Sequence, residues 1–173
     1  MIKAIVYKSQ TGHTKQYAEI LGKKTNLPVY ELNAATKELP GETEVIYLGW
    51  LMAGTVQGYK KAEKLFAVKA VCGVGMSGSD SRLADMRKSN QIPDNMPAFY
   101  LQGGFELAKL HGIYKLMMKM MKSTVGKGLA DKQNRTPEED AVLDLLLHGG
   151  NLVSDDNLSE MLNWHKKNTI KDY

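Results

Sequence analysis

The chain has a single cysteine, Cys72, among its 173 residues. One cysteine cannot form an internal disulfide framework, and no cluster of cysteines and histidines indicates a zinc module. No apolar run approaches the roughly 18 residues that are needed to span a bilayer. The N-terminal segment, residues 1–7, lacks a basic stretch followed by an apolar run and a cleavage site. We therefore expect no signal peptide and a cytoplasmic protein.

A strong excess of charge of one sign is also missing. Lysine and arginine together number 23 and aspartate and glutamate 19, which gives a formal net charge of +4. Because this is far from the dense basic stripe of a nucleic-acid-binding protein, we expect no nucleic-acid partner. The 43% of hydrophobic residues is enough for one sizeable core, and the length predicts a single domain over residues 1–173.

Short apolar runs alternate with stretches of helical periodicity along the chain. The runs at 2–7, 28–32, 45–48, 68–74 and 98–101 predict strands, and helices are expected at 15–24, 59–66, 82–90, 107–122, 137–148 and after residue 154. Strands that alternate with helices favour an α/β fold. We expect a doubly wound, five-stranded parallel sheet with helices on both faces and extra helices at the C-terminal end.

The segment after the first predicted strand is rich in hydroxyl groups and reads Ser9, Gln10, Thr11, Gly12, His13, Thr14. A helix follows at once, so the N–H groups of its first turn and these hydroxyls are placed to bind a phosphate, which the helix dipole also favours. Gly12 permits a close approach of the backbone. No lysine or arginine lies in the segment, so neutral donors alone would hold the anion. The alternative is that the serine and threonines only cap the helix.

This loop, Ser-x-Thr-Gly-x-Thr directly after an N-terminal strand, resembles the phosphate loop of flavodoxins, which binds the phosphate of FMN. The matches are Ser9, Thr11, Gly12 and Thr14. His13 stands where that family varies, and we expect it to form hydrogen bonds within the loop rather than to act as a catalyst. Residues 99–104 and 114–121 look like the flavodoxin-like branch that contains menaquinone-dependent protoporphyrinogen dehydrogenase, and residues 152–158 resemble other members of that branch.

The resemblance implies two further loops around a flavin ring. The first follows the third strand and consists of Trp50, Leu51, Met52, Ala53 and Gly54. In such a loop the indole stacks on the ring. The backbone of Ala53 and Gly54 would face N5, and the glycine would allow a peptide to flip between redox states. Alternatively, Trp50 is a core or interface residue.

The second loop follows the fourth strand and includes Gly75, Ser77, Gly78 and Ser79, whose N–H and hydroxyl groups would bind the polar edge of the ring or a substrate. Flavodoxins usually place an aromatic residue here. Because this loop has none, we expect one ring face to be open to a substrate, which favours an enzyme over a carrier. Residues 73–78 also match a dinucleotide fingerprint, but Asp94 precedes the next strand instead of ending it, so no NAD site is expected.

Residues 107–122 predict a helix rich in methionine, on which Lys115, Lys119 and Lys122 share one face. The wide apolar arc favours a core helix between the sheet and the C-terminal helices. The alternative is that part of the helix contacts an apolar ligand, a partner or a membrane surface.

The sequence thus predicts an FMN-binding oxidoreductase or electron-transfer protein. The resemblance implies a quinone or porphyrinogen-type substrate, or a redox partner protein. The alternative is a flavodoxin-like binding or regulatory module without a redox cofactor. No residue is predicted to be a general acid or base, since the flavin would carry the chemistry. Cys72, inside an apolar strand, is expected to be buried.

Overall fold

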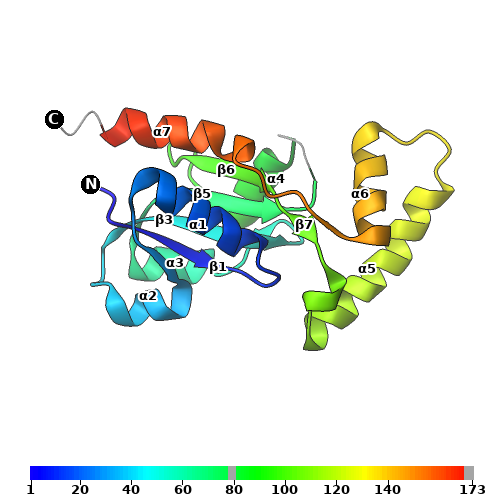
Figure 1. Ribbon diagram of the computed structural model, residues 1–173, viewed down its shortest axis with the longest axis horizontal. Helices are drawn as coiled ribbons and strands as arrows, with labels where there is room; N and C mark the ends of the chain where they lie inside the picture. Colours follow the sequence, from blue (N-terminus) through cyan, green and yellow to red (C-terminus); the bar gives the residue numbers. More distant parts are fainter. Residues whose placement is uncertain (78–80, 170–173) are drawn as a thin grey trace.

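The centre of the molecule is a mostly parallel sheet (Figure 1). The structure is a computed structural model, and it describes residues 1–77 and 81–169. Its strands lie in the order β2 (Val29–Glu31), β1 (Ala4–Lys8), β3 (Glu44–Met52), β5 (Ala67–Gly75) and β6 (Ala98–Gln102). Each neighbouring pair in this order runs parallel. The predicted α/β class and the mostly parallel sheet are confirmed.

Helices cover both faces of this sheet. Side chains of α1 (His13–Thr25) and α7 (Ser159–Thr169) join one core cluster, while α2 (Leu32–Glu38), α3 (Tyr59–Leu65) and α4 (Ser81–Asn90) contribute to the other. Successive side chains of a strand point to opposite faces. Accordingly Ile5 belongs to the α1 side and Val6 to the α3 side, and both are fully buried.

The third parallel strand is longer than predicted and continues into a hairpin. β3 turns at Ala53 and Gly54 and returns as β4 (Thr55–Val56), antiparallel to its own end. Both turn residues have positive φ, 48° and 80°, as a tight two-residue hairpin requires. The buried Asn90 of α4 holds the turn, because its amide donates to the Gly54 carbonyl and its oxygen accepts from the Val56 N–H, both at 2.8 Å.

The helix α2 was not predicted, because its seven residues directly follow a three-residue strand without a turn signal. The side chain of Glu31 accepts a hydrogen bond from the Asn33 N–H at 2.7 Å and so caps the helix start. A glutamate in this role is weaker as a sequence signal than serine, threonine, aspartate or asparagine.

The segment between β6 and α7 leaves the sheet and forms a helical arm, which we define as residues 104–151. Its first and last residues pair as the antiparallel strands β7 (Gly104–Phe105) and β8 (Gly150–Asn151). Between them lie η1 (Leu107–Lys109), α5 (Gly112–Asp131) and α6 (Pro137–His148). In Figure 1 the helices α5 and α6 lie beside the sheet layers, away from α7.

The expectation of a core helix at 107–122 is wrong. The ribbon of β7 and β8 carries α5 beyond the sheet instead of onto its face, and α5 begins only at residue 112. Ile113, Leu116 and Met120 are 68%, 59% and 62% exposed. In the part of the chain that the structure describes, no helix is long and apolar enough to cross a membrane.

The start of α6 is confirmed in detail. The Thr136 hydroxyl accepts from the Glu139 N–H at 3.2 Å, and the Glu139 carboxylate accepts from the Thr136 N–H at 2.9 Å. This reciprocal capping, with Pro137 at the first helical position, is what the sequence predicted. The last helix is likewise confirmed, since a short turn, η2 (Asp156–Leu158), leads into α7.

Candidate functional site

A cavity of about 410 Å³ lies at the carboxyl ends of the parallel strands, within the usual size range of small-molecule sites. Three predicted segments meet on it. They are Thr11, His13 and Thr14 from the first loop, residues 50–54 from the β3–β4 hairpin, and Gly75 and Ser77 after β5. The structure therefore brings together residues that are more than sixty positions apart in the chain.

Ser9, Gln10 and Gly12, the other predicted residues that the structure describes, do not line this cavity. Ser9 and Gly12 belong to one turn, in which the Gly12 N–H donates to the Ser9 hydroxyl at 3.1 Å. Gln10 lies in the same turn. Gly78 and Ser79 are outside the described residues.

The first turn of α1 keeps backbone donors uncommitted. The N-cap residue is Gly12, in a left-handed conformation with φ 101°, and no side chain caps the helix. Within residues 1–77 and 81–169, no hydrogen bond has the N–H of Thr11, His13 or Thr14 as its donor. The alternative that serine and threonine side chains cap this helix is therefore not what the structure shows. Free N–H groups at a helix start are the elements of an anion site.

Among the described residues, the buried His13 Nε2 and Trp50 Nε1 lack a hydrogen-bond partner, and the buried Glu106 Oε2 has the Lys109 ammonium as its charged neighbour at 2.7 Å. All three residues line the cavity. Because buried polar groups are nearly always hydrogen-bonded, their concentration on one cavity indicates a place where a ligand supplies polar groups.

The imidazole of His13 has two close polar neighbours. Its Nδ1 lies 3.0 Å from the Thr11 hydroxyl, and its Nε2 lies 3.3 Å from Glu106 Oε2. The same carboxylate oxygen is 2.7 Å from the Lys109 ammonium on the surface side. Burial lowers the pKa of His13 below its usual value, the Glu106 carboxylate opposes this, and the charge of Lys109 adds to it. The imidazole is therefore mainly neutral at pH 7.

The arm supplies an apolar wall of the cavity, whereas the sequence favoured a core helix here and offered contact with an apolar ligand only as the alternative. Tyr114, Met117, Met118 and Met121 of α5 line the cavity. Tyr114 meets the indole of Trp50 edge to face, with ring centroids 5.4 Å apart and an interplanar angle of 86°. From the sequence we expected no aromatic side chain on the face of a flavin ring that is open to a substrate, because residues 75–81 contain none. The structure instead brings an aromatic side chain to the cavity from a distant part of the chain.

The wall formed by β5 and β6 requires a glycine. A Cβ on Gly75 would come within 2.2 Å of the Tyr100 hydroxyl. Burial raises the pKa of the Tyr100 phenol, while a hydrogen bond with Ser77 and the charge of Arg82 act against this rise. Arg82, Tyr100 and Glu106 line the cavity and were missed by sequence reasoning. Neither their spacing nor a motif singles them out.

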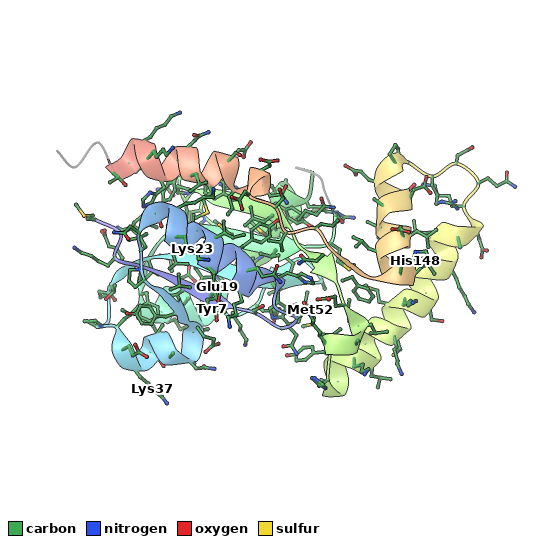
Figure 2. The ribbon with its side chains drawn as sticks, in the orientation of Figure 1. Tyr7, Glu19, Lys23, Lys37, Met52 and His148 are labelled. Atoms are coloured by element: carbon green, nitrogen blue, oxygen red, sulfur yellow. The ribbon has the colours of Figure 1, made fainter. Side chains whose placement is uncertain are left out.

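The Ala53–Gly54 turn lines the cavity, but part of its backbone is already bound. Asn90 holds the Gly54 carbonyl, so a peptide reorientation at this turn is confined to the Ala53–Gly54 peptide. Figure 2 shows Met52, the residue before this turn, on the side of the sheet that faces the arm.

Cys72 is fully buried in β5, as predicted, and burial raises the pKa of its thiol. Its Sγ lies 3.2 Å from Met161 Sδ of α7, away from the cavity lining.

Comparisons of the chain with protein-family models, with curated proteins and with solved structures found no match.

Proposed function

We propose that this chain binds FMN in the cavity and is an FMN-dependent oxidoreductase or electron-transfer protein. The observation that carries the proposal is that the three loops expected to hold phosphate and ring line one cavity.

The strand order supports the same proposal. The five parallel strands lie in the order β2-β1-β3-β5-β6. When these five are numbered one to five along the chain, the order becomes 2-1-3-4-5, which is the order of flavodoxin-like sheets. In such sheets the ligand binds where the strand order reverses, between the first and third strands. Thr11 and Thr14 after β1 and Trp50 at the end of β3 lie at this point and line the cavity.

The residues present fit the parts of FMN. The N–H groups at the start of α1 would hold the phosphate, and the indole of Trp50, with its unpartnered Nε1, would contact the ring. Arg82, the cation among the described lining residues, would help to neutralise the ligand's charge. FMN would supply one- and two-electron chemistry, while the protein orients the ring and excludes water.

An apolar substrate suits the remainder of the cavity. Met117, Met118 and Met121 give α5 a flexible apolar surface toward it, and methionine adapts to ligands of irregular shape. We infer that the second ligand is a quinone or a porphyrinogen-type ring, and that the protein is an enzyme rather than a carrier.

We also propose that the arm rests on an anionic lipid surface. The exposed apolar stripe of Ile113, Leu116, Met117 and Met120 follows helical spacing, and Lys115, Lys119 and Lys127 lie on the same helix. No acidic residue occurs in α5 before Asp131. Anionic lipid fits a basic helix with an exposed apolar stripe. Met117 belongs both to the stripe and to the cavity lining, so an apolar substrate would pass from lipid to the site along one helix.

The proposal is tested by purifying the protein and recording its visible spectrum, with and without added FMN. We expect a yellow protein, or one that becomes yellow with FMN, from which heat releases FMN. A colourless protein that does not quench FMN fluorescence would instead favour a binding or regulatory module without a redox cofactor. To separate enzyme from carrier, the dithionite-reduced protein is mixed with a soluble quinone, and rapid reoxidation is expected of the enzyme.

A further inference from the structure

The cavity wall contains a row of three groups that leads from the first loop to the surface. His13 is buried, with a side chain that is 4% exposed, and its Nε2 faces Glu106. Glu106 is partly exposed and contacts the ammonium of Lys109, whose side chain is 55% exposed. Because the Glu106 side chain is itself 29% exposed and its Oε2 lies 3.3 Å from Nε2, the carboxylate is the group that connects the buried imidazole to solvent.

The contact between His13 and Glu106 is incomplete as it stands. Nε2 and Oε2 are 3.3 Å apart without a hydrogen bond between them, and the charged partner of Oε2 is the Lys109 ammonium at 2.7 Å. On the other side of the ring, Nδ1 is already in contact with the Thr11 hydroxyl. A neutral imidazole has one N–H, so only one of its two nitrogens can donate, either Nδ1 toward the Thr11 hydroxyl or Nε2 toward the Glu106 carboxylate. One added proton makes both nitrogens donors and places a positive charge beside the carboxylate.

His13 is also the first residue of α1, so its own backbone N–H belongs to the turn that would hold the phosphate. A phosphate there places negative charge next to the imidazole and favours its charged form. The charged groups that face His13 are Glu106 and Lys109, both from the segment after β7, and Arg82 of α4 lines the same cavity.

We propose that His13 takes up one proton from solvent, by way of the Glu106 carboxylate, when a phosphate-bearing ligand occupies the loop after β1. This inference rests on the proposed FMN site and adds to it a residue that holds a proton at the cavity wall. The protonated imidazole would neutralise part of the ligand's charge in a loop that has no lysine or arginine between Ser9 and Thr14.

Calorimetry of FMN binding tests the inference. The titrations are run at pH 7.5, where the phosphate of FMN is already almost fully ionised, in buffers of different ionisation enthalpy. We expect the wild type to take up more than about half a proton per FMN bound. His13→Gln removes this uptake, and Glu106→Gln reduces it. His165, a partly buried histidine of α7 outside this cavity, is the control, and His165→Gln keeps the uptake. An uptake that is unchanged in His13→Gln overturns the inference even when FMN binds.

A second measurement separates this inference from the FMN proposal. The imidazole signals of the free protein are followed by NMR over pH 5–9, with and without inorganic phosphate. If FMN does not bind, the proposed function fails. The inference stands if phosphate moves the His13 titration to higher pH by about one unit or more. It is overturned if neither phosphate nor FMN moves it. Loss of folding in a variant is checked by circular dichroism, and the wild-type NMR titration does not depend on any variant.

Discussion

The indole of Trp50, in β3, meets the ring of Tyr114, in α5, almost at a right angle, with centroids 5.4 Å apart. This contact joins the sheet to the arm at the cavity. Since Trp50 Nε1 is buried without a hydrogen-bond partner, the indole is held in place by packing and retains an unused donor.

Replacing this indole tests its role directly. Trp50→Ala should weaken FMN binding more than tenfold, because stacking plus buried apolar area exceeds about 1.4 kcal/mol. Fluorescence titration with FMN measures the change. Trp164→Ala is the matched control, because Trp164 packs against Phe99 in the α7 core and lies outside the cavity. Equal affinity in Trp50→Ala and the wild type would defeat the assignment of Trp50.

The left-handed conformation of Gly12 gives a second prediction. Gly12→Ala forces an alanine to φ 101° although its Cβ would meet nothing closer than Gln16 Nε2 at 4.0 Å. We expect strain of about 1–3 kcal/mol and a distorted loop, so FMN affinity should fall while the affinity for riboflavin, which lacks the phosphate, stays the same. Gly128→Ala in α5 has open space and should not affect either ligand. An equal loss of affinity for FMN and for riboflavin would show that the loop does not bind the phosphate.

The role of Asn90 is structural. It is 1% exposed and binds the Val56 N–H and the carbonyls of Gly54 and Met86. Asn90→Ala leaves these buried groups unpaired and should lower the free energy of unfolding by about 2–4 kcal/mol. Urea unfolding measures this loss, with the exposed neighbour Ser89→Ala as the control. A cost below about 0.5 kcal/mol would mean that the hairpin does not depend on Asn90.

Stability should also depend on pH through two histidines. Burial lowers the folded-state pKa of both His13 and His165 below the usual 6.5. The unfolded chain therefore binds more protons as the pH falls through 6.5, and the free energy of unfolding should decrease from pH 7 to pH 5. His13→Gln and His165→Gln should each reduce this decrease in urea unfolding. The same slope in the double variant would assign the pH dependence to other groups.

Sequence reasoning succeeded where the signal is local. The five parallel strands are short apolar runs, and the start of α6 has a Thr136–Glu139 capping box. The first loop was singled out because its hydroxyls and glycine directly follow a strand, and three of its residues, Thr11, His13 and Thr14, line the cavity. These patterns depend on residues within about one helical turn of each other.

What could not be predicted depends on the path of the arm. A helix with a wide apolar arc is typical of a core, yet α5 keeps Ile113, Leu116 and Met120 exposed because the β7–β8 ribbon carries it away from the sheet face. Tyr114 and Glu106 reach the cavity through the same path. Nothing in their local sequence indicates this position, since only tertiary structure brings them near β1 and β3.

The exposed stripe of α5 predicts binding to lipid. Vesicles containing anionic phosphatidylglycerol should sediment with the wild type, while neutral phosphatidylcholine vesicles should not. The triple variant Ile113→Ser, Leu116→Ser, Met120→Ser should lose this binding and keep its FMN affinity, because these three side chains do not line the cavity. Sedimentation of the triple variant with anionic vesicles, as for the wild type, would contradict the proposal. So would a wild-type protein that forms dimers and binds neither kind of vesicle.

The central claim is that the cavity at the ends of β1, β3 and β5 holds FMN by its phosphate and its ring. The most direct measurement is a titration of the FMN-free protein with FMN, followed by the flavin's fluorescence. We predict quenching that saturates at one FMN per chain, with clearly tighter binding of FMN than of riboflavin. FMN fluorescence that stays unchanged in an excess of folded protein would contradict the claim.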